Sequence, residues 1–266
     1  MEATISRVRL ATGLALHYLE QGPSTAEEAV VLVHGWPDSA RSYSRLLAAL
    51  PTRYRAVAMD LRGFGDSDRP ASGYMIDDFA GDVAALVDAI GRTGVTLVGH
   101  SMGSFVARRV AVARPDLVRR LVLVGTAVTA DNAVLREVVD VVRDLPDPVP
   151  MEFVREFQTS TLHTPIPDEF FDALVAESRK APARVWRAAL NGILAFDDAS
   201  ALGRITAATL VLGGQQDALF TCEEQAATAA AIPRARLTLY PETGHCPNWE
   251  HPDRVAADIA AFVAES

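Results

Sequence analysis

The stretch VTLVGHSMGSFVAR, from Val95 to Arg108, places a serine between two glycines where two structural patterns meet. Ahead of Ser101 lies a β-branched, apolar run that is typical of a buried strand, and behind it lies a helix-like pattern. A sharp strand-to-helix turn strains its central residue, and side chains two positions away on either side would collide with neighbouring backbone. Gly99 and Gly103 remove that collision. The stretch therefore predicts that Ser101 is a nucleophile held in a tight turn.

The overall composition is that of a chain with a large buried core. Of its 266 residues, 49% are hydrophobic and 22% are charged, which is too apolar for a disordered chain. The formal net charge is -9, and the arginines are scattered along the chain. We therefore expect no nucleic-acid partner, and small neutral or apolar molecules fit better as ligands.

Cysteine usage and hydropathy bear on the compartment. Cys222 and Cys246 are too few for a disulfide framework and suit a reducing compartment. The N-terminal stretch MEATISRVRL lacks the apolar core of a signal peptide, and no apolar run approaches the roughly 18 residues of a membrane span. We expect a cytoplasmic protein, monomeric or homodimeric, that binds no membrane.

Short apolar runs alternate with helical patterns along most of the chain. Eight runs have the character of strands: SRVRLA, LALHYLE, AVVLVHG, YRAVAMD, VTLVGH, LVRRLVLVG, ATLVLGG and ARLTLY. The middle ones are apolar throughout, as in strands that are covered on both faces. The alternation predicts an α/β fold with a doubly wound, mostly parallel eight-stranded sheet.

Residues 128–198 interrupt the alternation, because this segment has helical patterns and several prolines but no convincing strand. We predict that this helical insertion is a lid over the carboxyl edge of the sheet, where open α/β sheets bind ligands. The predicted core domain then consists of residues 1–127 and 199–266. Aromatic residues of the insertion at helical spacing are assigned to its core rather than to the site.

Four motifs resemble the α/β-hydrolase fold family in sequence and order: HGWPDS at 34–39, DLRGFGDSDRP at 60–70, GHSMGS at 99–104 and GHCPNWEHP at 244–252. The resemblance covers nearly the whole chain. It implies the α/β-hydrolase fold with a helical lid. One departure is Ser104, where many members carry a second glycine; the turn tolerates small residues there.

A nucleophilic serine needs a base, and the base needs a third group to fix its tautomer. The resemblance implies that His245, beyond the last predicted strand, is the base. It likewise implies that Asp217, after the strand that follows the insertion, is the acid, which completes the chain order Ser, Asp, His. No metal-binding histidine spacing is present, so neither a metal nor a cofactor is predicted.

Acyl transfer also needs N–H donors for the oxyanion. Met102, which follows the nucleophile, supplies one predicted donor. Trp36 supplies the second, because Gly35 lets the backbone approach the ligand and Pro37 has no N–H.

Three further polar residues of the motifs are given supporting roles. His34 is expected to anchor its loop by hydrogen bonding, and Asp60 to organise the loop that follows it. His100 is expected to point away from Ser101.

The identity of the nucleophile narrows the reaction. Dehalogenases and epoxide hydrolases of this family use an aspartate where this chain has Ser101, and the insertion lacks the tyrosines that assist epoxide opening. We therefore predict a serine hydrolase that cleaves carboxylic esters or lactones of small, largely apolar substrates through an acyl-enzyme. Two alternatives stay open: a carbon–carbon bond hydrolase of vinylogous diketones, and a ligand receptor or signalling protein that retains the triad.

Overall fold

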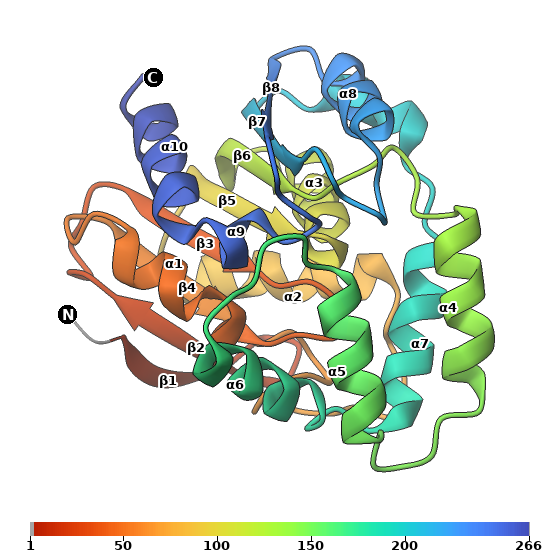
Figure 1. Ribbon diagram of the computed structural model, residues 1–266. Helices are drawn as coiled ribbons and strands as arrows, with labels where there is room; N and C mark the ends of the chain where they lie inside the picture. Colours follow the sequence, from red (N-terminus) through yellow and green to blue (C-terminus); the bar gives the residue numbers. More distant parts are fainter. Residues whose placement is uncertain (1–2, 266) are drawn as a thin grey trace.

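The computed structural model describes residues 3–265 and contains one mixed sheet surrounded by helices (Figure 1). Its strands are β1 (Thr4–Arg9), β2 (Ala15–Gln21), β3 (Ala29–Val33), β4 (Arg55–Met59), β5 (Val95–His100), β6 (Val118–Val124), β7 (Ala208–Gly214) and β8 (Ala235–Tyr240). They lie in the order β1-β2-β4-β3-β5-β6-β7-β8. β2 pairs antiparallel with β1 and β4, and every other pairing is parallel. The predicted eight-stranded, mostly parallel sheet is confirmed.

The helices of the described residues are η1 (Ala40–Tyr43), α1 (Ser44–Ala49), α2 (Ile76–Ala89), α3 (Met102–Ala113), α4 (Ala133–Arg143), α5 (Met151–Ser160), α6 (Asp168–Ser178), α7 (Ala183–Leu194), η2 (Ala199–Arg204), α8 (Cys222–Ala231), α9 (Pro247–Glu250) and α10 (Pro252–Ala264). Within residues 3–265, no helix combines the length and the apolar character that crossing a membrane requires.

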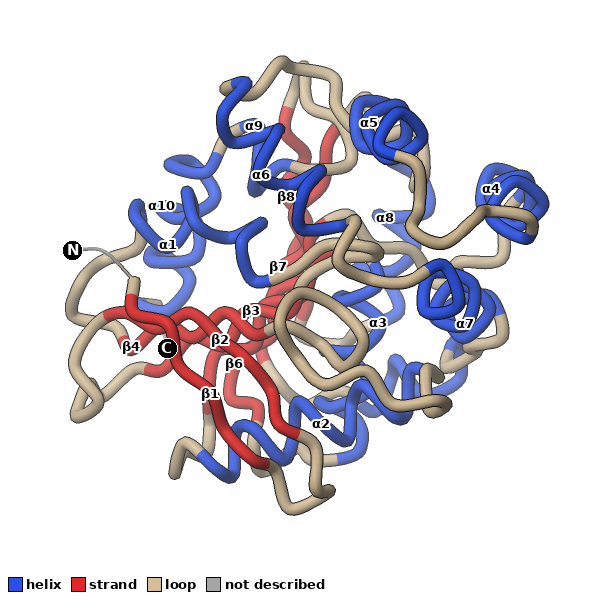
Figure 2. Tube along the Cα trace, turned by 90° about the horizontal axis from the view of Figure 1, so that it is seen from below, coloured by secondary structure: helices blue, strands red, loops and turns tan. Residues whose placement is uncertain are grey.

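Both faces of the sheet are buried, which explains why its central strands are apolar throughout. In β3, Val31 and Val33 pack into the cluster that contains α2 and α3, whereas Val30 and Leu32 pack into the cluster that contains α1 and α10. Figure 2 shows these two helix pairs on opposite sides of the strands. Successive side chains of a strand point to opposite faces, so a strand between two helical layers needs apolar residues at every position.

The connection from β6 to β7 holds α4, α5, α6 and α7, which gather on one side of the sheet (Figures 1 and 2). The structure shows no strand between residues 128 and 198, all of which it describes. The helical content of the insertion is therefore as predicted. Its role as a lid and the division into domains at residues 128 and 198 stay predictions.

Arg108 of α3 ties both ends of the helical insertion to the helix that follows Ser101. Its guanidinium donates to the carbonyl oxygens of Ala127 at 2.6 Å and Val128 at 2.8 Å. It also donates to both carboxylate oxygens of Asp198, at 2.6 and 3.1 Å. The side chain of Arg108 is fully buried, and burial lowers its pKa while it raises that of Asp198. Breaking a buried pair leaves an uncompensated charge behind.

We expect Arg108→Met to lower the free energy of unfolding by about 3–5 kcal/mol, because Asp198 and two carbonyl groups lose their buried partner. Urea unfolding followed by circular dichroism measures the loss. Arg109→Met is the matched control, because Arg109 is a partly exposed neighbour that pairs with the exposed Asp77. A change within about 0.5 kcal/mol is expected for that control. Adding Asp198→Leu to Arg108→Met should recover part of the lost unfolding free energy. A loss for Arg108→Met no larger than that of the control would contradict the stabilising role of the Arg108 hydrogen bonds.

Candidate active site

Ser101 lies in a strained turn between β5 and α3. Its backbone has φ 53° and ψ −120°, in a region that side chains rarely adopt, and its N–H donates to the Val124 carbonyl at 2.9 Å. A β-carbon on Gly99 would overlap the Gly103 carbonyl, and one on Gly103 would overlap the Val33 carbonyl. Any side chain at either glycine would therefore push the turn apart, as the sequence predicts.

Asp217 and His245 come from the loops after β7 and β8 and form a buried hydrogen-bonded pair. His245 Nδ1 lies 2.9 Å from Asp217 Oδ2, while Asp217 Oδ1 accepts from the N–H groups of Leu219 and Phe220 at 2.8 and 3.0 Å. Burial alone would raise the pKa of the Asp217 carboxyl, but His245 and the two N–H groups outweigh it and lower that pKa. The carboxylate therefore fixes the imidazole with Nδ1 as the donor and Nε2 as the acceptor.

Ser101 and His245 line the same cavity. The Nε2 atom of His245 is buried and has no hydrogen-bond partner among the described residues, so its lone pair is available to accept a proton. No hydrogen bond joins it to Ser101 in this structure. The three sequence-predicted residues are thus brought together as a bonded Asp–His pair whose histidine lines the same cavity as the serine. Catalytic hydrogen bonds are often long or unformed before a substrate binds.

The two predicted oxyanion donors, Trp36 and Met102, also line the cavity. Met102 is the first residue of α3, where a backbone N–H has no partner within the helix. Neither the Trp36 N–H nor the Met102 N–H donates to a protein acceptor in the described part of the chain. The Trp36 ring is held in place by Trp186, whose ring lies 5.0 Å away and whose carbonyl accepts from Trp36 Nε1.

The remaining cavity wall is largely apolar, and part of it comes from the helical insertion. The cavity is narrow in this structure, with a volume of about 30 Å³. Its apolar lining includes Phe105, Leu135, Phe157, Leu190, Ile193, Leu219, Phe220, Cys246 and Trp249. Sequence analysis missed the role of Phe157, because at helical spacing an aromatic core residue and a cavity residue look alike.

Hydrogen bonds of His34 and Asp60 join the loop that carries His34 to the loop after β4. The His34 ring lies 2.7 Å from the Gly35 carbonyl through Nδ1, and its Nε2 accepts from the Leu61 N–H at 3.0 Å. Asp60 Oδ1 accepts from the Ala40 N–H at 2.7 Å, which ties the two loops together again. Both residues thus have the structural roles expected of them.

The prediction that His100 points away from Ser101 is wrong. His100 lines the cavity, and its Nε2 lies 3.1 Å from the His245 carbonyl. Burial and, to a smaller extent, the nearby His245 lower the pKa of His100 to about 3, so the ring is neutral at physiological pH. A carbonyl only accepts hydrogen bonds, so the single ring proton is on Nε2 and Nδ1 is a bare acceptor.

Asp38, in the same loop as Trp36, is a functional candidate that sequence analysis did not identify. It is 3% exposed and lines the cavity. Its Oδ1 accepts from Gln158 Nε2 of α5 at 2.9 Å. Burial raises the pKa of the Asp38 carboxyl to about 7, against smaller lowering effects of Gln158 and His245. The only sign of this role in the sequence is that a charged residue follows Gly35, Trp36 and Pro37 in the loop.

The loop that carries His245 is bonded to the chain that leaves α5. The His245 N–H donates to the Thr161 carbonyl at 2.8 Å. The Glu250 carboxylate accepts from the N–H groups of Gly244 at 2.9 Å, Thr164 at 2.6 Å and His163 at 3.2 Å. Burial raises the pKa of Glu250, and these hydrogen bonds partly offset that effect. Glu250 positions the loop of His245, a role that sequence analysis also missed.

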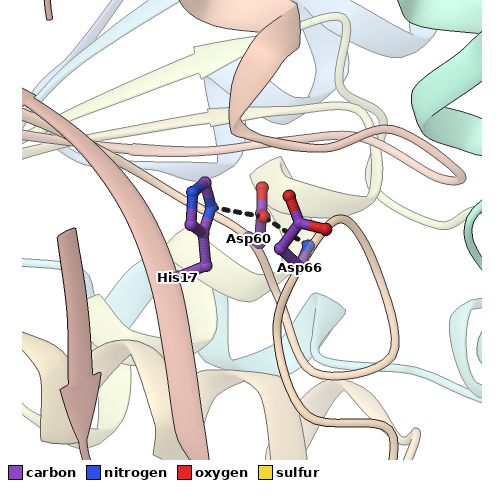
Figure 3. A group of neighbouring side chains, drawn as sticks. All are labelled: His17, Asp60 and Asp66. Atoms are coloured by element: carbon purple, nitrogen blue, oxygen red, sulfur yellow. Dashed lines mark hydrogen bonds and ion pairs between the residues drawn. The ribbon is translucent and has the colours of Figure 1, made fainter. Parts of the chain in front are cut away.

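His17, Asp60 and Asp66 form a group with the spacing of metal ligands, with potential ligand atoms within 4.8 Å of one another (Figure 3). The atoms that could bind a metal already make other contacts, however. Asp60 Oδ2 accepts from His17 Nδ1 at 2.7 Å and from the Asp66 N–H at 2.8 Å, and the Asp66 carboxylate pairs with Lys180 at 2.8 Å. Because a cation and two donors already occupy these oxygens, the group organises the loop after β4 rather than offering a metal site.

The His17–Asp60 pair predicts a pH-dependent contribution to stability. The hydrogen bond to Asp60 raises the pKa of His17 against the opposing effect of burial. The contribution of the charged pair is therefore complete below the ordinary histidine pKa of about 6.5 and is lost as the pH rises through the raised value. We expect His17→Leu to cost about 1–2 kcal/mol at pH 6 and less at pH 9, measured by urea unfolding.

The control for this prediction is His163→Leu, because His163 is exposed. Its effect should be small and should not change between the two pH values. A His17→Leu effect that grows toward pH 9 would contradict the assignment.

Comparison with known proteins agrees with the fold and the motifs. A family model described as alpha/beta hydrolase fold matches residues 28–252. A non-heme chloroperoxidase of Streptomyces lividans is 31% identical over 96% of this chain and 98% of its own length. A 2-hydroxy-6-oxononadienedioate/2-hydroxy-6-oxononatrienedioate hydrolase of Dechloromonas aromatica is 29% identical over 98% and 96%, respectively. The structure of an esterase from Exiguobacterium antarcticum superposes over the full length of both chains with a TM-score of 0.89 at 21% identity, a likeness of fold.

Other relatives match only in part. Mouse epoxide hydrolase 4 is 33% identical over 43% of this chain, and the match spans 32% of that protein. The family model and the full-length chloroperoxidase relative cover most of the chain, including the turn around Ser101 and the loops of Asp217 and His245. The chain therefore belongs to the α/β-hydrolase fold family and is a hydrolase.

Proposed function

We propose that this protein hydrolyses carboxylic esters or lactones of small, largely apolar molecules with Ser101 as the nucleophile. The observation that carries the proposal is the buried His245–Asp217 pair, whose free Nε2 lies in the same cavity as the strained serine. That arrangement supplies a base with a fixed tautomer beside a hydroxyl group.

The proposed reaction uses each of these groups in turn. Ser101 Oγ attacks the ester carbonyl as its proton passes to His245 Nε2, and the oxyanion accepts hydrogen bonds from the Trp36 and Met102 N–H groups. His245 then gives its proton to the leaving alcohol, and the C–O bond to that alcohol breaks. Water repeats the sequence on the acyl-enzyme, with His245 first accepting its proton and then returning it to Ser101.

A carbon–carbon bond hydrolase is the second candidate, and the full-length relative from Dechloromonas aromatica favours it. The name of that relative's substrate denotes a dicarboxylate. The described side chains that line the cavity of this chain include no arginine or lysine, and they do include Asp38. A dianionic substrate would find no cationic partner in that wall, so the cavity favours a neutral ester.

The test combines labelling with turnover. A fluorophosphonate probe should modify Ser101, located by tryptic digestion and mass spectrometry, and p-nitrophenyl butyrate should be hydrolysed. A label confined to another residue would contradict the nucleophile assignment. Turnover of a vinylogous diketone with negligible ester cleavage would establish the second candidate instead. Tight binding of an ester without turnover would favour a receptor.

A further inference from the structure

The catalytic cavity contains a carboxyl group that the proposed ester hydrolysis does not use. Gln158 Nε2 donates to Asp38 Oδ1 at 2.9 Å and to Ser178 Oγ of α6 at 3.0 Å, so both of its N–H groups are engaged. Through these bonds, two helices of the insertion hold the Asp38 carboxyl at the cavity wall. The other oxygen, Oδ2, has no hydrogen bond to any described residue.

A second polar atom without a partner lies in the same wall. His100 is 2% exposed, and its Nδ1 has no hydrogen-bond partner among the described residues. Because its Nε2 carries the ring proton and donates to the His245 carbonyl, Nδ1 can only accept. A buried acceptor that remains unsatisfied costs about 1–3 kcal/mol. The site is therefore suited to a ligand that brings a hydrogen-bond donor.

These two atoms converge beside the proposed nucleophile. A β-carbon on Gly35 would lie 3.2 Å from Asp38 Oδ2, 3.1 Å from His100 Nδ1 and 3.1 Å from Ser101 Cβ. The three groups thus lie around the bare Cα of Gly35, and the residues that carry them all line the cavity. A ligand atom bound to the carboxyl and the imidazole would lie next to the carbonyl that Ser101 attacks.

The chemistry of the two atoms selects the group that binds. His100 Nδ1 requires a donor, which excludes ethers and ketones. Asp38 titrates near neutral pH, so its carboxyl either donates or accepts. A hydroxyl group satisfies both when the carboxyl is neutral, because it donates to the imidazole and accepts from the carboxyl. When the carboxyl is ionised, the hydroxyl donates to one of the two acceptors. The rest of the wall is largely apolar and offers no counterion for an anionic group.

We propose that Asp38 and His100 form a subsite that binds a hydroxyl group of the substrate beside its scissile carbonyl. Hydroxylated esters are then preferred over the corresponding esters without the hydroxyl. This inference rests on the proposed function, because it names the substrate class of the same site. We expect a preference of about 10- to 100-fold in kcat/KM, since the unhydroxylated ester leaves both buried groups unpaired.

The kinetic test compares matched esters. One pair, p-nitrophenyl 3-hydroxybutyrate and butyrate, places the hydroxyl on the acyl side, and another, 2-hydroxyethyl and propyl butyrate, places it on the alcohol side. A preference in either pair supports the subsite and tells which side it contacts. The 3-methoxybutyrate ester, which accepts but does not donate, should show no such preference. Values of kcat/KM that agree within twofold in both pairs of esters would overturn the proposal.

Variants assign the preference to Asp38. Asp38→Leu should reduce the ratio between the paired esters to near one. Thr161→Val is the matched control, because it removes a cavity hydroxyl whose hydrogen bond goes to the Gln158 carbonyl, and the ratio should persist. A preference that survives Asp38→Leu would contradict the proposal. If that variant does not fold, Asp38→Asn serves instead. Its amide carbonyl can keep the Gln158 bond while its NH₂ group faces the subsite, so kcat/KM for the methoxy ester should rise relative to that for the hydroxy ester.

A binding measurement separates this inference from the proposed function. Ser101→Ala is titrated calorimetrically with methyl 3-hydroxybutyrate and methyl butyrate, and with the alcohol-side pair. A hydroxyl-dependent gain of tenfold or more in affinity supports the subsite even if the wild-type protein hydrolyses no ester, an outcome that would contradict only the proposed function. Equal affinities in both pairs, with ester turnover intact, would overturn the subsite alone.

Discussion

Ser101→Ala should reduce kcat/KM for p-nitrophenyl butyrate by at least about a thousandfold, which corresponds to about 4 kcal/mol of lost transition-state stabilisation. The variant keeps the turn, the His245–Asp217 pair and the two N–H donors, but no hydroxyl group remains to attack the carbonyl. The residual rate then reports what the oxyanion donors and substrate binding contribute without the nucleophile. Initial rates at substrate concentrations well below KM measure the effect directly.

The matched control for this prediction is Ser160→Ala. Ser160 is exposed at the end of α5, and its hydroxyl donates to the Phe157 carbonyl. The kcat/KM of the Ser160→Ala variant should stay within twofold of the wild-type value. A Ser101→Ala variant that is as active as this control would remove the serine mechanism.

Asp217→Asn should lower kcat by about 10⁴-fold, a factor known for the same change in another serine-hydrolase triad. The structure explains how the amide would be oriented. Asp217 Oδ1 accepts from the Leu219 and Phe220 N–H groups, so the amide oxygen must stay there and its NH₂ group must face His245 Nδ1. The imidazole then carries its proton on Nε2 and cannot accept one from Ser101.

A control for Asp217→Asn is Asp253→Asn, the same change at an exposed position in the first turn of α10. Its kcat should be unchanged. The folded state of Asp217→Asn is checked by its urea midpoint, so that a loss of structure is not mistaken for a loss of chemistry. A folded Asp217→Asn protein with a kcat within tenfold of the wild type would contradict the role of this carboxylate.

Local patterns in the chain were enough to predict the sheet and to nominate the site. The central strands are contiguous apolar runs, and the turn around Ser101 depends on residues only two positions away, so both leave a signature in the sequence. Asp217 and His245 could be named because each follows a recognisable strand in a motif of the family. The structure places these two in contact across 28 residues of chain.

Contacts between distant segments left no such signature. Asp38 contacts Gln158 across 120 residues, and Glu250 contacts Thr164 across 86. The sequence around each of these residues gives no sign of its partner. The error on His100 has a different cause. Alternation along β5 predicts opposite directions for successive side chains, but the positive φ of Ser101 ends that alternation, and both residues face the cavity.

The bonds of Glu250 and of the His245 N–H limit how a substrate can reach the cavity. They anchor the exit of α5 to the loop that holds His245, the proposed general base, so an outward swing of that exit would move the imidazole away from Ser101. A protein opened in this way could not transfer the Ser101 proton to His245 until it closed again. A gate that preserves the catalytic geometry must instead lie on the opposite flank, where α4 and α7 contribute Leu135 and Leu190 to the wall.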